Sequence, residues 1–489
     1  MIVAALCIAV GGVTFEKVDI PDLYVQRAMS LFDAQASNFR HADVDADGHM
    51  DLLLPTRVYR RPDGQFDPER FMPMPEVTSE TRVDIWGNRL FFQSASSLAV
   101  YELVDGAWNQ TLNIEHACRL QELHRLEPDE ERPLIAFERF LHDVDSDGRP
   151  EILRVEDAGI AVSVLEDNGL ESTHLDLYPP PRLSMFAGHE TLWPQSERRI
   201  SLPTRNAMFQ VVLDGDAAVV VNRIRHQGGM FAFRVERYRI SNDSENRFTL
   251  IPESTHQTEP LPRHVYLPIA LNEDGIVDYF GYRRERLSYN NWKPFVRGYA
   301  STDGGKNVQI ASTRGFSRRA MFTDLDGDGD KDWVGEESGL VSGGLRETAN
   351  RALFQRKIRH TILARMQNDD GTFESRWREL GQFTMQFDKP PRHLTYRFWQ
   401  YRTGHLTDFT ADFNGDRWTD VLVCGEPGTV SLYLGGQNGF SDQVEASINV
   451  PRNAFPVAID IDGDGRSDVV VLKDNSHAPL EIFLNVEDT

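Results

Sequence analysis

The stretch Asp460-Ile-Asp-Gly-Asp-Gly-Arg-Ser-Asp468 places carboxylates at positions 1, 3, 5 and 9 of a nine-residue loop, with a glycine at position 6. The apolar run Val469-Val-Val-Leu472 follows at once. Oxygen ligands at this spacing suit a hard cation that takes roughly six to eight oxygens, which means calcium before magnesium. Because a short β-branched run is typical of a strand, the loop is expected to join two strands, with position 9 opening the second.

The sequence contains five copies of this loop, which begin at residues 43, 143, 324, 412 and 460. One alternative is a solvated acidic turn, since Asp and Gly are also ordinary hairpin residues. Five copies at fixed offsets favour a metal, because carboxylates this close repel one another unless a cation lies among them. The predicted ligands are Asp43, Asp45, Asp47 and Asp51; Asp143, Asp145, Asp147 and Glu151; Asp324, Asp326, Asp328 and Asp332; Asp412, Asn414, Asp416 and Asp420; and Asp460, Asp462, Asp464 and Asp468.

An EF-hand begins with the same pattern but requires a bidentate glutamate at position 12, between two helices. Position 12 of the five copies is occupied by Leu54, Arg154, Gly335, Val423 and Val471. The segments that follow the loops are also aliphatic and β-branched rather than helical in pattern. The EF-hand interpretation therefore fails in every copy.

The loops resemble the FG-GAP (VCBS) repeats of integrin α-subunit propellers and of many bacterial secreted proteins. In that family the loop lies between the first two strands of a blade, and calcium (Ca²⁺) stabilises the hairpin. The resemblance implies an all-β fold, a β-propeller of four-stranded antiparallel blades. It also implies up to five calcium sites at the side chains named above.

Two loops depart from the pattern. Arg417 occupies position 6 of the fourth loop, where a positive φ would make a β-carbon cost on the order of 1 kcal/mol. Asn414 also replaces a charged ligand there, so the 412–420 loop is expected to bind calcium most weakly. Glu151 keeps a carboxylate on a longer arm, and the second loop should still bind.

The intervals between loops contain further candidate blades. Residues 270–278 are a worn copy of the loop that keeps positions 3, 5, 6 and 9. Residues 212–220 are a second worn copy, which keeps only positions 3 and 5 and is expected to bind no cation. Residues 80–115 read as a meander of strands without a cation loop. This gives eight blades, or seven if the meander belongs to its neighbour. The last blade supplies three evident strands, and the N-terminal stretch 13–18 could provide the fourth.

The repeat runs the length of the chain and predicts a single propeller domain over residues 13–489, with insertions near 179–205 and 340–400. Within the second insertion, residues 345–365 have loosely helical apolar spacing and predict a charged amphipathic helix.

Residues 2–13 form an apolar run suited to a signal peptide at 1–12, although no Lys or Arg precedes it. A buried first strand and a start codon placed too late are the alternatives. Export, to the periplasm, the cell surface or the medium, is the expected localisation.

The composition of the chain narrows the classes of partner that it is expected to bind. The 52 Lys and Arg against 75 Asp and Glu give a net charge of 52 − 75 = −23. Such a surface repels nucleic acid and anionic lipid, so neither is an expected partner. Among the three cysteines, Cys118 and Cys424 fall in distant blades, so stability is expected to come from packing and metal rather than from a disulfide. No further apolar run is long enough to span a membrane, and we expect a monomer.

Function is less determined than fold. The sequence contains no catalytic signature such as His-Glu-x-x-His, Gly-x-Ser-x-Gly or a Walker loop, and we assign no catalytic residue. The expected function is a recognition or adhesion scaffold for a surface polysaccharide or protein, with the aromatic stretches 289–295 and 396–401 as candidate contacts. The alternative is a propeller polysaccharide lyase or hydrolase acting on acidic glycans, for which His393 and Arg397 would be candidates.

Overall fold

The structure is a computed structural model, in which the described residues form 34 strands and no helix. The described residues are 13–20, 40–54, 57–59, 67, 69–75, 81–115, 135–137, 140–145, 147–155, 159–166, 169–176, 199–202, 209–214, 216–225, 231–242, 248–257, 266–269, 271, 278–285, 295–302, 307–314, 321–338, 357–386, 407–426, 428–451, 454–462, 464–473 and 480–486. By its contacts the chain divides into two compact units, Gln26–Arg263 and His264–Thr489 with Met1–Val25.

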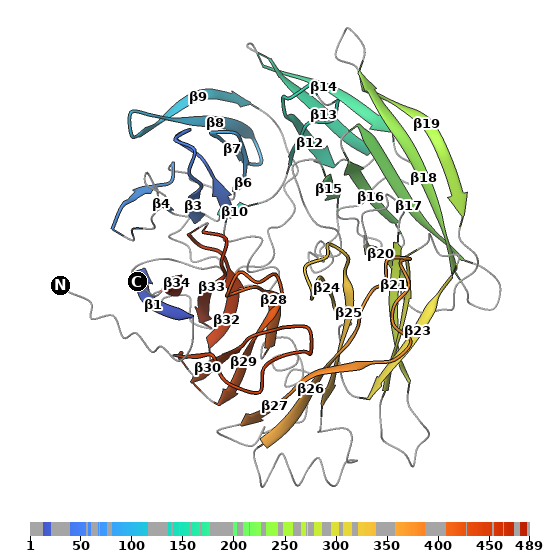
Figure 1. The fold of residues 1–489 in the computed structure, drawn as a ribbon. Coiled ribbons are helices and arrows are strands. Elements are labelled where there is room, and N and C mark those ends of the chain that lie inside the picture. The colour runs from blue at the N-terminus through green and yellow to red at the C-terminus, as the bar shows by residue number, and fades with distance from the viewer. Residues whose placement is uncertain are drawn as a thin grey trace, which may run out of the picture. The chain divides into compact units, whose positions relative to one another are not determined.

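The 26–263 unit contains four sheets, whose neighbouring strands lie side by side (Figure 1). The first consists of β2 (Arg40–Ala42), β3 (Asp51–Leu54), β4 (Arg57–Tyr59) and β5 (Phe71–Pro73). The second consists of β6 (Thr81–Trp86), β7 (Arg89–Gln93), β8 (Ser97–Val104) and β9 (Ala107–Glu115), with β10 (Ile135–Phe137) added in parallel beside β6. The third consists of β11 (Leu141–His142), β12 (Glu151–Val155), β13 (Gly159–Glu166) and β14 (Gly169–Asp176). The fourth consists of β15 (Arg199–Leu202), β16 (Phe209–Asp214), β17 (Ala217–Arg225), β18 (Phe231–Asn242) and β19 (Phe248–Gln257).

The 264–489 unit also contains four sheets. They are β20 (Tyr266–Ile269), β21 (Asp278–Glu285), β22 (Phe295–Ser301) and β23 (Gln309–Arg314); β24 (Met321–Thr323), β25 (Asp332–Ser338), β26 (Lys357–Arg365) and β27 (Arg378–Gln386); and β28 (Thr407–Ala411), β29 (Asp420–Glu426), β30 (Thr429–Tyr433) and β31 (Ala446–Asn449). The last sheet consists of β32 (Ala454–Ile459), β33 (Asp468–Lys473), β34 (Leu480–Val486) and the N-terminal β1 (Thr14–Ile20).

These sheets confirm the predicted fold class, an all-β propeller of mainly four-stranded antiparallel blades. Each of the five acidic loops joins the first two strands of its sheet, and position 9 is the first residue of the second strand, as predicted. The meander over 81–115 is a sheet of its own, so the described residues contain eight blades rather than seven. Two of the eight have a fifth strand, which the sequence analysis did not predict.

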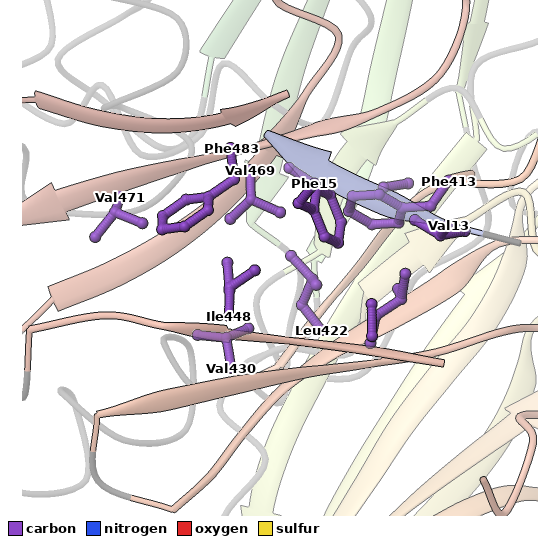
Figure 2. Close-up of a cluster of buried hydrophobic side chains, with 13 residues drawn as sticks. Val13, Phe15, Phe413, Leu422, Val430, Ile448, Val469, Val471 and Phe483 are labelled. Carbon is purple, nitrogen blue, oxygen red and sulfur yellow. The ribbon is translucent and has the colours of Figure 1, made fainter. Parts of the chain in front are cut away.

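The N-terminal strand completes the last blade, as predicted. β1 pairs antiparallel with β34, with Thr14 opposite Val486 and Ile20 opposite Leu480. Figure 2 shows the side chains that fix this arrangement: Val13 and Phe15 lie among residues of the last two blades. The ring of Phe15 meets that of Phe413 edge-on, with centroids 5.9 Å apart. Burial of two apolar side chains therefore holds β1 in place in addition to its ladder of hydrogen bonds.

Four further clusters of buried side chains among the described residues likewise combine two successive sheets. One joins Val144, Leu153 and Val162 of the third sheet to residues of the fourth, including Leu213, Val220 and Phe248. Others join the first sheet to the second, the second to the third, and the β24–β27 sheet to the β28–β31 sheet. The core thus lies between blades, as expected of blades that cannot bury their faces alone.

Two expectations about local structure were wrong. The predicted helix at 345–365 is a strand over Lys357–Arg365, where β26 pairs with β25 and β27. Residues 362–365 are buried on both faces of the sheet, and the spacing of apolar residues in such a strand can resemble that of a buried helix. The acidic pair near 214–216 lies in the tight hairpin between β16 and β17, the second and third strands of its blade, so it is not a worn cation loop.

Several predictions fall on residues outside those described. These are the signal peptide at 1–12, the aromatic stretches 289–294 and 396–401, His393 and Arg397. Of the insertion predicted near 179–205, only Arg199–Leu202 is described, as β15. Of the segment 340–400, residues 357–386 are described and include β26 and β27. The single-domain assignment to 13–489 stays a prediction.

Candidate metal centres

Carboxylate oxygens converge in four of the five loops. In each group one oxygen per residue lies within 4.8 Å of the others. The groups are Asp43, Asp45 and Asp51; Asp143, Asp145 and Glu151; Asp324, Asp326 and Asp332; and Asp460, Asp462 and Asp464. Ligands on opposite sides of a calcium ion are roughly 5 Å apart, because each Ca–O distance is about 2.3–2.6 Å. The spacing therefore fits a single calcium ion in each group.

The other predicted ligands lie outside these groups. They are the position-5 residues Asp47, Asp147 and Asp328, the position-9 residue Asp468, and the whole fourth loop, Asp412, Asn414, Asp416 and Asp420. Position 5 shapes the loop, both in these copies and in the fifth loop, where Asp464 also belongs to the converging group. Its Oδ1 accepts a hydrogen bond from the backbone N–H of position 7, at 2.9 Å between Asp47 and His49 and 2.7 Å between Asp147 and Arg149. All 20 ligand assignments stay predictions.

Position 1 organises the turn. Its Oδ2 accepts a hydrogen bond from the N–H of position 6 in every copy, at 2.7–3.0 Å. In these loops the carboxylate side chains accept hydrogen bonds from backbone N–H groups, and these bonds fix the conformation of the turn around the carboxylates before any cation binds. A cation would find most of its ligands already positioned.

Position 9 has a second role that the sequence analysis missed. One of its carboxylate oxygens accepts the backbone N–H of position 2, at 3.1 Å for Val44 and Asp51 and at 2.7 Å for Val144 and Glu151. The same bond occurs in the third, fourth and fifth loops at 2.7–3.0 Å. The worn copy retains it, since the N–H of Leu271 donates to Asp278 at 2.7 Å. Position 9 is therefore structural even where the first ligand is lost.

The position-2 side chain anchors the loop in the core. Its members are Val44, Val144, Leu325, Phe413 and Ile461, all buried, and the worn copy has buried Leu271. The signal was present in the sequence, because position 2 is apolar in all six copies. Ligands on alternate residues leave this side chain to point the other way, into the cluster between blades.

Burial of the position-9 carboxyls changes their acidity. Desolvation, together with neighbouring aspartates of the same loop, raises the pKa of Glu151 and Asp468 to about 8 and that of Asp332 and Asp420 to about 7. Backbone N–H donors oppose this rise but do not outweigh it. A cation among the carboxylates would favour the ionised form and return the pKa toward its ordinary range.

These shifts predict a pH dependence with a definite sign. In calcium-free solution the folded chain keeps protons that the unfolded carboxyls, with pKa values of about 4, have released, so stability falls as the pH rises toward 8. Buried His360, whose pKa is lowered from 6.5 to about 4, has the opposite effect below pH 6.5. Between pH 6.5 and 8 we therefore expect the melting temperature to fall without calcium and to change much less with it. Thermal melts at both pH values would check this, and a calcium-free melting temperature that rises over this interval would contradict it.

One carboxylate oxygen supports the fit to a cation directly. Asp326 Oδ1 is buried and has no hydrogen-bond partner among the described residues. Desolvation raises the pKa of Asp326, and Asp328 and Asp324 add to the rise. A buried acceptor without a donor costs about 1–3 kcal/mol, and a cation would satisfy it. The residues present thus fit calcium, which would neutralise the loop and tie its ligands together.

The fourth loop differs in the way that the sequence predicts. Arg417 has a φ of +75°, and the glycines at position 6 of the other loops have φ between +86° and +97°. Asn414 Nδ2 donates to Asp416 Oδ2 at 3.0 Å, so that the amide presents its nitrogen to a carboxylate. Strain and a lost charge both disfavour a cation here, and the 412–420 loop remains our weakest predicted site.

Replacing Arg417 with glycine should strengthen this loop. The Arg417→Gly change removes the β-carbon strain and a positive charge that follows Asp416 in the sequence of the loop, so we expect up to about 1 kcal/mol of added stability and tighter calcium binding. The reverse change in the fifth loop, Gly465→Arg, is the matched variant, because Gly465 has a φ of +89°. Chemical denaturation of both variants with calcium would check the pair. A loss of stability on Arg417→Gly would show that the arginine side chain contributes more than its backbone strain costs.

Within the 264–489 unit, the position-2 carbonyl of a loop accepts a hydrogen bond from the next sheet. The carbonyl of Leu271 accepts from Lys331 N at 2.9 Å and from Gln367 Nε2 at 3.1 Å. The carbonyl of Leu325 accepts from Thr419 N at 3.0 Å, and that of Phe413 accepts from Asn485 Nδ2 at 2.6 Å. The backbone N–H of the same residue donates to the position-9 carboxylate of its own loop. At Leu271, Leu325 and Phe413 the position-2 residue therefore connects its own buried carboxylate to the neighbouring blade.

Comparisons with known proteins agree with the loops. Residues 412–471 match the model of the FG-GAP-like repeat, a segment that includes the fourth and fifth loops. This match confirms the resemblance predicted from the sequence. No curated protein matches the chain. Among solved structures, the WD40 domain of SCAP from fission yeast is 9% identical over 97% of this chain and 98% of that chain, with a TM-score of 0.27. So distant a likeness carries no argument about the metal centres.

Proposed function

We propose, from the FG-GAP-like repeat at residues 412–471 and the carboxylate groups of the blade loops, that this chain is a calcium-loaded propeller that serves as an exported recognition or adhesion scaffold. Its partner would be a surface polysaccharide or a protein. The observation that carries the proposal is the repeated placement of converging carboxylates in the first hairpin of a blade. Calcium there would rigidify the hairpins and keep the neighbouring surface loops in a binding-competent shape.

The net charge of the chain and the classes of partner that it disfavours support the same proposal. The net charge of −23 disfavours nucleic acid and anionic lipid as partners. No helix among the described residues is long and apolar enough to cross a membrane. Calcium loops of modest affinity fit an exported protein, because extracellular calcium is high enough to fill them. A monomer is the expected state.

The test is a binding panel of immobilised polysaccharides and cell-surface proteins, with the full chain in calcium and after chelation. Selective retention in calcium that is lost on chelation is the expected result. Retention that does not depend on calcium would separate recognition from the loops and contradict the proposal. Release of unsaturated or reducing-end products from a polysaccharide would instead favour the alternative function, a lyase or hydrolase acting on acidic glycans.

A further inference from the structure

Asn242 brings a side chain from a neighbouring blade to the second loop. It is the last residue of β18, whereas the loop at 143–151 joins β11 to β12 in the preceding sheet. Asn242 Nδ2 donates to Asp145 Oδ2 at 2.7 Å, and this contact is partly buried. Asp145 occupies position 3 of the loop and converges with Asp143 and Glu151. An amide of one blade therefore contacts the carboxylate group of another.

The other half of the Asn242 amide is unsatisfied. Its Oδ1 is buried and accepts no hydrogen bond from the part of the chain that the structure describes. A buried amide oxygen without a donor destabilises the fold. Rotation about the last side-chain bond exchanges the amide nitrogen and oxygen, which places Oδ1 against Asp145. Two oxygens in that position repel each other unless a cation lies between them.

We propose that Asn242 Oδ1 is a ligand of the cation bound by the 143–151 loop, supplied by the neighbouring blade. Amide oxygens are among the ligands that calcium accepts. The rotated Oδ1 would take the place of Nδ2, which lies 2.7 Å from Asp145 Oδ2, and oxygens at about that separation can share one ion at Ca–O distances of roughly 2.3–2.6 Å. Asn242 would thus replace its hydrogen bond to Asp145 by a shared ion when calcium is bound. The inference rests on the proposed loading of the loops with calcium.

This site would connect two blades that already share a core. Val144, at position 2 of the same loop, packs with Leu213, Ala218 and Ile240 of the fourth sheet. Asn242 follows Ile240 by two residues on the same strand, so its side chain leaves β18 on the same face. Calcium at the second loop would therefore clamp together the two sheets at the edge of their shared cluster.

Two substitutions separate a ligand from a hydrogen-bond donor. Asn242→Asp keeps an oxygen but adds a charge beside Asp145, so it should lower the melting temperature without calcium and restore or exceed the wild-type value with it. Asn242→Leu removes both polar atoms and should weaken one calcium site by about tenfold or more while the other sites keep their affinity. Asn109→Asp is the control, because it adds the same charge at an exposed position of β9, in a sheet whose described residues include no cation loop.

Calcium titration calorimetry measures the affinities of the full-length variants, and thermal melts with and without calcium measure their stability. If Asn242 only donates to Asp145, Asn242→Asp lowers the melting temperature equally with and without calcium, and the inference is overturned. Unchanged calcium affinities in Asn242→Leu would also overturn it. If the wild-type chain gains no stability from calcium, the proposed function fails as well. If the wild type gains stability but Asn242→Asp does not recover in calcium, only the assignment of Asn242 fails.

Discussion

Removing calcium should lower the melting temperature of the chain by on the order of 10 °C. Each compact unit contains two of the four converging groups, the loops at 43 and 143 in one unit and those at 324 and 460 in the other. A site filled at about a hundredfold above its dissociation constant adds roughly 2.7 kcal/mol, because the unfolded chain has no preformed loop to bind the ion. Two sites add roughly 5 kcal/mol to a unit of this size, where each kcal/mol raises the melting temperature by about 2–4 °C.

Differential scanning calorimetry of the decalcified chain, with and without added calcium, would measure this shift. Magnesium is the control cation. It demands a smaller, near-octahedral site and dehydrates reluctantly, so it should stabilise the chain much less. Equal melting temperatures with and without calcium would mean that the acidic loops are solvated turns. That outcome would also remove the main physical support for the proposed scaffold.

The prediction of the fold succeeded where the sequence pattern is local. Each nine-residue loop carries its own turn chemistry, and the run after it, such as Val469-Val-Val-Leu472, has no competing interpretation. The same holds for Arg417, whose positive φ follows from its place in the loop. The completion of the last blade by residues 13–18 could be predicted because a three-stranded blade would leave an open edge.

The wrong and missed predictions involve interactions that the spacing of residues along the sequence does not reveal. Residues 357–365 have a pattern compatible with both a buried helix and a doubly buried strand, and only the partners β25 and β27 decide between them. The contact of Asn242 with Asp145 joins residues 97 positions apart, so no loop motif could reveal it. The structural role of position 9 was hidden for another reason. A carboxylate at a ligand position already had an explanation, which obscured its hydrogen bond to the backbone.

That double role predicts different losses for two residues to which the sequence gives the same role. Asp468 is fully buried, and its two oxygens accept the N–H groups of Ile461 and Asn485, each at 2.7 Å. Asp468→Ala leaves both buried N–H groups without an acceptor, which costs about 1–3 kcal/mol each. We therefore expect a loss of about 4 kcal/mol without calcium, and a larger loss with it.

Asp462→Ala is the matched variant in the same loop. Asp462 Oδ1 accepts the N–H of Asp464 at a long 3.3 Å in an exposed setting, whereas Asp468 accepts two buried N–H groups at 2.7 Å, so removal of Asp462 should cost less than removal of Asp468 without calcium. In calcium it removes a converging oxygen, and the loss should grow by roughly 2 kcal/mol, since one ion no longer stabilises the folded state. Urea denaturation of both variants with and without calcium would measure the four losses. If Asp468→Ala costs no more than Asp462→Ala in calcium-free solution, position 9 acts only as a ligand. If Asp462→Ala costs the same in both conditions, position 3 is not a ligand at all.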